Sequence, residues 1–270
     1  MIIDFHTHTF PDKIAKKTID YLSAKANITP CSNGSVAGLV ERMSEAEIDV
    51  AVNLPVVTNP SQFESINRFA MGINEAFEGK SRRIISFAGI HPACEDIKGK
   101  MKWIKDQGFV GIKIHPDYQE TYFDDEGYIS IISSAKELDL IVTTHAGVDA
   151  GYPDSSVKCT PDRVRKVIRR VGHEKLVLAH MGGSEMSDEV CSILCGEDVY
   201  FDTAYVLRFL SQETIMRIID RHGEDRILFA SDSPWSNIGA DAEILRSYNL
   251  GKETEKKIFC SNAKKLLGIR

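Results

Sequence analysis

Several features of other protein classes are missing from this chain of 270 residues. No run approaches the ~18 consecutive apolar residues of a membrane span, and no positive segment followed by an apolar stretch marks a secretion signal. No block or stripe of Lys and Arg is present, and 39 acidic against 33 basic residues give a net charge of −6. These absences argue against nucleic acid and anionic membranes as partners, and we expect a cytoplasmic protein.

Cysteine is present, but not in the pattern of a disulfide framework. The six cysteines are scattered, and no C-x-x-C pair occurs. In a long chain without a secretion signal we expect free, reduced thiols. Cys191 and Cys195 lie four residues apart on a predicted helix, where two buried small side chains are a simpler interpretation than a soft-metal or redox site.

What the sequence does contain is an alternation of short apolar runs with segments of helical spacing. Runs such as Val50-Ala51-Val52 are continuous, which is typical of parallel strands covered on both faces. The eight predicted strands are Met1–Phe5, Ile48–Leu54, Ile84–Ile90, Phe109–Ile114, Leu140–Thr144, Lys175–Ala179, Val199–Thr203 and Arg226–Ala230. Helical patterns are clearest over Ser61–Glu78, after Thr160-Pro161-Asp162, after Ser211 and over Glu253–Leu267.

A strand followed by a helix, counted eight times, predicts an α/β fold of the (β/α)8 TIM-barrel type. The competing doubly wound sheet would more often carry a Gly-rich phosphate turn after its first strand, and none follows Met1–Phe5. No linker, repeat or low-complexity segment divides the chain, so we expect one domain over residues 1–270.

Polar residues gather where the predicted strands end, which in such barrels is the side of the active site. Asp232 follows the eighth strand, and His173, which precedes a strand, is expected at the surface. The histidines that follow predicted strands are His6, His8, His91, His115, His145 and His180. Histidines scattered through a core or surface would not collect at one end of a barrel, so the pattern indicates a metal site.

The residue types suit a divalent ion. His6 and His8 are two residues apart at the end of a strand, so both imidazoles can point the same way. Imidazole and carboxylate suit Zn²⁺, and also Mn²⁺, Fe²⁺ or Co²⁺. We interpret His6, His8 and His145 as ligands, with Asp232 reaching the metal and acting as general base. His180 either binds a second metal or polarises the group that is attacked.

With these residues the chain resembles the amidohydrolase superfamily, in the amidohydrolase-related branch that includes aminocarboxymuconate semialdehyde decarboxylase and related hydratases and hydrolases. The resemblance runs from His6-Thr7-His8 through His145, His180 and Asp232 to Asn262–Gly268. It implies that His6, His8, His145 and Asp232 bind metal, most simply one zinc ion, and that His180 binds metal or substrate.

Lys113 leaves the number of metal ions open. Phe109–Pro116 resembles the stretch of dihydroorotases in which a carbamylated lysine bridges two metals, and Lys113 stands at that position. Many members of the decarboxylase-like branch hold one metal and need no bridge. In that case Lys113 is a cation for a substrate carboxylate, and His115, two residues further on, faces the same substrate.

Three hypotheses for function follow. The favoured one is a metal-dependent hydrolase that uses an activated water to cleave an amide, lactone or related bond in a small substrate that can carry a carboxylate. The alternative is a lyase that decarboxylates or hydrates an unsaturated acid, with Lys113 or Arg208 as the carboxylate anchor. A catalytically inactive binding barrel is disfavoured by the intact site. Asp202 and Tyr205 are either substrate contacts or structural residues, and a homodimer is expected only as the commonest assembly.

Overall fold

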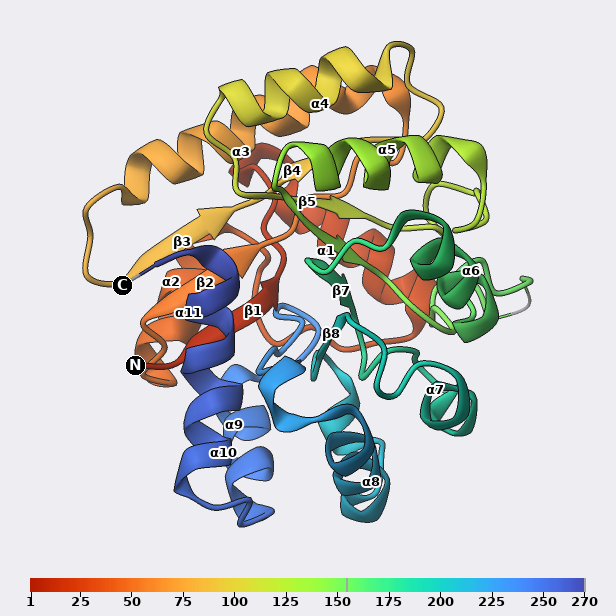
Figure 1. Ribbon diagram of the computed structural model, residues 1–270. Helices are drawn as coiled ribbons and strands as arrows, with labels where there is room; N and C mark the ends of the chain where they lie inside the picture. Colours follow the sequence, from red (N-terminus) through yellow and green to blue (C-terminus); the bar gives the residue numbers. More distant parts are fainter. Residues whose placement is uncertain (154, 270) are drawn as a thin grey trace.

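The computed structural model describes residues 1–153 and 155–269, and its strands lie in the middle of the molecule with helices around them (Figure 1). Every strand pair is parallel. One sheet has the order β1 (Ile3–Thr7), β2 (Val50–Asn53) and β3 (Arg83–Ser86). The other has the order β4 (Ala88–Gly89), β5 (Gly111–Ile114), β6 (Ile141–Thr144), β7 (Leu176–Leu178), β8 (Tyr200–Asp202) and β9 (Ile227–Leu228).

The first strand and the segment after the last strand lie side by side. Phe5 N donates to Phe229 O at 2.9 Å, and Asp232 N donates to His6 O at 2.8 Å. His8 N donates to the carbonyl of Ser233 at 2.6 Å. The expected α/β barrel class is confirmed, although the strands pair formally as sheets of three and six rather than as one closed ring. These bonds bring His6 and His8, at the end of the first strand, next to Asp232, which follows the last strand.

The third predicted strand is divided into β3 and β4 at Phe87. Side-chain amides of the preceding helix, α3 (Phe63–Phe77), explain the break, because they bond the backbone in place of a neighbouring strand. Asn74 Oδ1 accepts from Ser86 N at 2.7 Å, and Asn67 Oδ1 accepts from Gly89 N at 2.8 Å. The apolar run Ile84–Ile90 predicted the strand but carried no information about these two amides.

The helices connect the strands and cover their outer faces. Thr160 and Ser211 cap helices as predicted, since their side chains accept from Arg163 N and Thr214 N. The last predicted helix consists of two short helices joined by a π-helical turn, η4 (Lys257–Ser261). The α-helices are α1 (Asp12–Ala26), α2 (Val36–Glu45), α3 (Phe63–Phe77), α4 (Ile97–Asp106), α5 (Glu126–Glu137), α6 (Pro161–Val171), α7 (Ser187–Ile193), α8 (Gln212–His222), α9 (Ile238–Ser247), α10 (Lys252–Lys256) and α11 (Asn262–Leu267). Three short 3₁₀ segments are η1 (Pro60–Gln62), η2 (Val206–Arg208) and η3 (Glu224–Arg226).

Alternate residues of each strand enter different parts of the core. Val50 and Val52 belong to an inner cluster with Phe5, whereas Ala51 packs with the helices. Helix α11 adds Leu266 to the inner cluster. Burying a side chain of this size stabilises the fold by roughly 1.5–3 kcal/mol, so the inner cluster is a firm apolar base beneath the polar strand ends.

Two histidines outside the strand ends are structural. His173, expected at the surface, is buried, and its Nε2 lies 2.8 Å from Leu140 O. His222 is buried against Phe201, with ring centroids 3.8 Å apart, and its Nε2 lies 3.0 Å from Val199 O. The expectation that His173 lies at the surface was wrong, because its position in the sequence before a strand does not show which other segments cover its side chain. Among the described residues, no helix is long and apolar enough to cross a membrane.

Candidate metal centre

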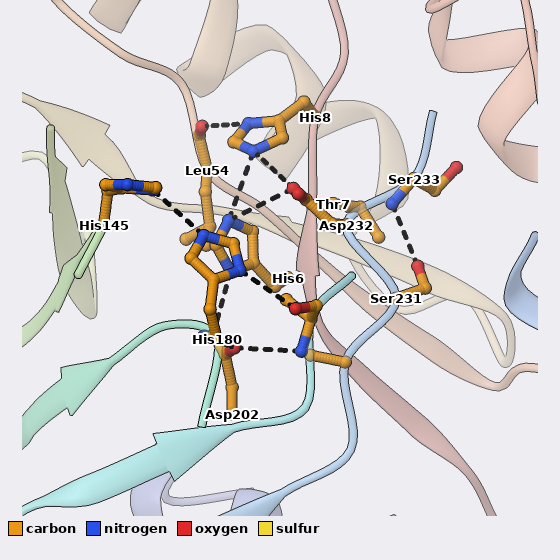
Figure 2. Close-up of polar contacts among 12 residues, drawn as sticks. His6, Thr7, His8, Leu54, His145, His180, Asp202, Ser231, Asp232 and Ser233 are labelled. Atoms are coloured by element: carbon orange, nitrogen blue, oxygen red, sulfur yellow. Dashed lines mark hydrogen bonds and ion pairs between the residues drawn. The ribbon is translucent and has the colours of Figure 1, made fainter. Parts of the chain in front are cut away.

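Three ligand-type side chains meet where β1 runs beside the segment after β9 (Figure 2). His8 Nε2 lies 3.1 Å from Asp232 Oδ1, and His6 Nε2 lies 3.5 Å from the same oxygen. The two Nε2 atoms are 3.2 Å apart. His6 is fully buried, His8 is half-buried, and Asp232 is 8% exposed. The structure therefore brings together three of the four side chains that the sequence nominated as ligands.

Hydrogen bonds on the far side of each ring determine which nitrogen faces this cluster. His6 Nδ1 lies 2.8 Å from Asp202 Oδ2, and His8 Nδ1 lies 2.8 Å from Leu54 O (Figure 2). An ionised carboxylate and a carbonyl oxygen only accept, so each Nδ1 carries the proton. Each Nε2 is left with a lone pair directed into the cluster, which is the form in which imidazole binds a metal.

The donor set fits a divalent cation. The Nε2 atoms of His6 and His8 and the Oδ1 atom of Asp232 are all acceptors, and lone pairs this close repel unless a cation lies among them. Burial, and then the charge of Lys113, hold the pKa of His6 well below its usual value, so its ring stays neutral at pH 7. Two neutral imidazoles and a carboxylate are ligands for Zn²⁺, Mn²⁺ and similar ions.

His145, the fourth nominated ligand, lies in a different place. His180 Nδ1 lies 2.9 Å from Ala204 O and carries a proton, so His180 Nε2 is an acceptor. His145 Nδ1 lies 3.0 Å from that nitrogen and is therefore the donor (Figure 2). This contact turns His145 Nε2 away from His6 and His8, and the nitrogen is buried without a hydrogen-bond partner among the described residues.

His145 forms a second group with His115 and Asp149, in which the ligand-type atoms all lie within 4.8 Å of one another. His115 Nε2 lies 3.4 Å from Asp149 Oδ2, and its ring is stacked between Tyr118 and His145, with centroid separations of 4.0 and 4.4 Å. His145 Nε2 faces Asp149 Oδ2 at 4.0 Å and Asp117 Oδ2 at 3.9 Å. Since its Nε2 is engaged with Asp149 and its ring is stacked with two others, His115 is part of a stack of rings rather than a free donor.

Lys113 lies at the end of β5 and is 1% exposed. Its Nζ lies 3.0 Å from His6 Nε2, the nitrogen whose lone pair faces the candidate ligands. Burial lowers the pKa of Lys113 to about 8, although Asp202 and Asp232 act in the opposite direction. Lys113 thus places an amine, which can be positively charged, directly beside the candidate metal ligand His6.

An unusual backbone conformation orients two of the candidate catalytic side chains, His180 and Asp232. His180 has a φ of 61° and Asp232 a φ of 68°, both in the left-handed region that non-glycine residues rarely adopt. His180 N donates to Asp202 Oδ1 at 3.0 Å, and Asp232 N donates to His6 O, which hold these conformations. Such strain costs on the order of 1–3 kcal/mol a residue and is concentrated at functional sites.

Asp202 has a role that the sequence did not reveal. It is fully buried, accepts from the backbone of His180 and of Ala204, and its second oxygen contacts His6 Nδ1. It therefore cannot touch a substrate, as one sequence interpretation had it, and instead fixes the ring of His6. Its place at the end of a strand was a signal for this site, but its partner lies on a strand far away in the sequence.

A cavity of about 720 Å³ opens above these residues. Tyr205 and Trp235 belong to its lining, whereas Arg208 does not and instead contacts Ser236. The nominated residues that line it are His6, His8, Lys113, His115, His145, His180 and Asp232. The structure thus gathers these seven residues around one cavity, even though His145 and His115 stand apart from the other ligand-type side chains.

A model of the protein family described as amidohydrolase matches residues 3–269 of the chain. The chain belongs to the amidohydrolase family. No curated protein matches the chain in sequence.

Solved structures similar to the chain include aromatic acid decarboxylases. The 5-carboxyvanillate decarboxylase of Sphingomonas paucimobilis has a TM-score of 0.72 and 13% identity, with 100% of this chain and 99% of that chain covered. The 2,6-dihydroxybenzoate decarboxylase of Rhizobium has a TM-score of 0.68 and 17% identity, with 99% and 98% covered. A dihydroxybenzoic acid decarboxylase of Polaromonas sp. JS666, solved with bound manganese, has a TM-score of 0.68 and 16% identity, with 99% and 96% covered. At these identities the likeness establishes the fold.

The comparisons correct the favoured functional hypothesis. We expected a hydrolase, with Asp232 as the base of a hydrolytic reaction, and that expectation was wrong: the similar enzymes named above are decarboxylases. The lyase alternative agrees with them. The error has a chemical origin, because the histidines and the aspartate that the sequence displays serve both reaction types, and the reaction is decided by how the substrate is presented to them.

Proposed function

We propose that this amidohydrolase-family protein is a metal-dependent decarboxylase of a planar, unsaturated carboxylic acid, and an aromatic acid in particular. The observation that supports the proposal is the position of Lys113. Its Nζ lies on the floor of the cavity, 3.0 Å from Nε2 of His6, which is one of the three candidate metal ligands. Arg208, the other candidate anchor, lies outside the cavity lining. A carboxylate drawn to Lys113 would therefore lie beside His6, His8 and Asp232.

The proposed ligands of a single ion are His6, His8 and Asp232. His145 would join them only if its ring turned away from His180, which its Nδ1 now contacts. A divalent ion bound by this set supplies Lewis acidity that polarises an oxygen of the substrate. Zn²⁺ and Mn²⁺ both suit the set, and the Polaromonas enzyme was solved with manganese.

Stacked rings beside the floor favour a planar substrate. The rings of Tyr118 and His115 are 4.0 Å apart and inclined by 19°, and those of His115 and His145 are 4.4 Å apart and inclined by 9°. Each of these rings contributes to the cavity lining. An aromatic or conjugated acid can lie along this wall with offset packing, whereas a bulky saturated ring has no flat face to present.

Decarboxylation breaks the bond between the carboxyl carbon and the ring, so that the acid anion and one proton give CO₂ and a C–H bond. A proton must therefore reach the carbon that loses CO₂. We assign its delivery to Asp232, whose carboxylate lies on the cavity floor and would take up one proton from the solvent before each turnover and pass it to that carbon. His180 Nε2 accepts from His145 Nδ1, so we assign His180 to hold the ring of His145 in position beside the substrate.

The proposal is tested by release of labelled CO₂ from a panel of carboxyl-labelled hydroxybenzoic acids, with protein reconstituted with Mn²⁺ or Zn²⁺. We expect release by the wild type and a loss of about 100-fold or more in kcat/KM for Lys113→Met, because a desolvated charge pair is removed. Lys98→Met, on the exposed face of α4, is the control. Products formed without CO₂, or full activity of Lys113→Met with its metal content intact, would contradict the proposal.

A further inference from the structure

The cavity is larger than its polar floor. Its volume of about 720 Å³ lies in the range of roughly 300–1,000 Å³ that accommodates drug-sized ligands. The candidate ligands His6, His8 and Asp232 and the amine of Lys113 occupy the floor, where β1, β5 and the segment after β9 end, whereas the charged side chain of Lys17 lies on α1. Above the floor the lining is mainly apolar. Its apolar residues include Ile14, Leu22, Ile28, Val56, Ile66 and Phe69.

Helix α1 supplies one wall and is incompletely covered. Of its fifteen residues only Ala15 and Ile19 are buried. Ile14 is 48% exposed and Tyr21 is 62% exposed, and both line the cavity. Large apolar side chains left in contact with water at the mouth of a site mark a surface that a ligand covers. Ile66 and Phe69, half-buried on α3, also contribute to the lining.

The wall of α1 is continuous with the catalytic floor. Lys25, near the end of α1, places its Nζ 3.4 Å from the centre of the Tyr152 ring. The Tyr152 ring is 5.5 Å from that of Tyr118, which is stacked on His115. Tyr152 and Lys25 lie behind the cavity lining, but Ile14, Tyr21 and Lys113 line the same cavity, so a molecule with its acid group at Lys113 can also lie against α1.

From this arrangement we infer that the substrate carries an extended apolar group, and that the channel between α1 and α3 binds it. The inference rests on the proposed function for the position of the acid group, and it adds the chemical class of the remainder: an aromatic carboxylic acid with an alkyl or aryl extension.

Binding of 4-alkylbenzoates by the manganese-loaded protein tests the inference. Affinity is measured by calorimetry for benzoate and for chains of one to six carbons, below the concentrations at which they form micelles. We expect each added methylene to strengthen binding by about three- to fourfold until the chain reaches the open mouth. Phe69→Ala should weaken binding of 4-hexylbenzoate by about tenfold or more and leave benzoate unchanged, and Ile66→Ser should act in the same direction.

Phe77→Ala is the matched control, because Phe77 is also half-buried on α3 but does not line the cavity. Equal affinity along the series, or an equal loss in Phe77→Ala, would overturn the channel while leaving benzoate binding and CO₂ release to support the decarboxylase. Chain-length dependence that Phe69→Ala abolishes would support the channel even if no CO₂ were released. Failure of every acid to bind would overturn both.

Discussion

At the scale of single residues, the contact between Asp202 and His6 sets the state of the candidate metal centre. The carboxylate holds the proton on His6 Nδ1 and leaves Nε2 free for a cation. We predict that Asp202→Asn lowers metal affinity by about 10- to 100-fold, because an amide orients the ring and raises its basicity less than a carboxylate does. Competition with a fluorescent chelator measures the dissociation constant.

Asp241→Asn is the control for this variant. Asp241 is equally buried and bonds to Ser236, but it is outside the group of His6, His8 and Asp232. Its replacement should leave metal affinity within about twofold of wild type. If Asp202→Asn bound metal as tightly as Asp241→Asn, the orienting role of Asp202 would be wrong.

His222 should make stability depend on pH. Burial lowers its pKa to about 4 in the folded protein, against about 6.5 in an unfolded chain. The neutral ring is therefore favoured by folding, and its contribution is complete above pH 6.5 and is lost as pH falls towards 4. By pH 5 the loss is on the order of 2 kcal/mol. Urea titrations at pH 7 and pH 5 should give a smaller difference for His222→Gln than for wild type; equal differences would refute this.

The sequence could predict His6, His8 and Asp232 because strand parity and barrel polarity fix where such side chains point. It could not predict that His145 turns to His180, since that contact depends on a hydrogen bond to the carbonyl of Ala204 in the next strand's loop. The role of Asp202 was hidden for a similar reason. Ligand candidates follow from local pattern, whereas their orientation is set by neighbours distant in sequence.

At the scale of secondary-structure elements, Gln119 ties together three loops at the carboxyl ends of strands. Its Nε2 donates to Val57 O at 2.7 Å and to Ile90 O at 2.8 Å. Its Oε1 accepts from His115 N at 3.0 Å and from the Tyr128 hydroxyl at 2.7 Å. These bonds satisfy backbone groups that would otherwise be buried unpaired, so the loops around the site share one anchor.

Gln119→Ala should therefore lower the free energy of unfolding by about 3 kcal/mol or more, because several buried groups lose their partners. Gln107→Ala, an exposed position after α4, is the control and should change the free energy of unfolding by less than about 0.5 kcal/mol. Chemical denaturation of both variants measures the difference. A Gln119→Ala variant as stable as Gln107→Ala would show that the loops are held by other contacts.

Strands could be predicted from the sequence where a continuous apolar run alone determined them. Each predicted strand overlaps an observed one, because continuous apolar runs reflect burial on both faces. The break between β3 and β4 arises from Asn67 and Asn74 on another element, so no run of strand residues could reveal it. In the same way, an apolar position on α1 does not show whether protein or ligand covers it.

At the scale of the whole molecule, the alternation of strands and helices predicted the barrel class, because a parallel sheet needs a crossover after every strand. The same alternation could not distinguish hydrolysis from decarboxylation. That distinction depends on the cavity, where Lys113 and the stacked rings of His115 and Tyr118 meet only after the chain has folded. Fold was therefore accessible from the sequence and reaction type was not.

The central claim is that His6, His8 and Asp232 hold one divalent ion on which the reaction depends. Elemental analysis of protein without a histidine tag, dialysed after exposure to Mn²⁺ or Zn²⁺, tests it most directly. We predict about one equivalent of metal per chain for the wild type and a small fraction of that for His8→Ala. This substitution removes a half-buried ring and leaves the core intact. Absence of metal in the wild type, or full occupancy in His8→Ala, would contradict it.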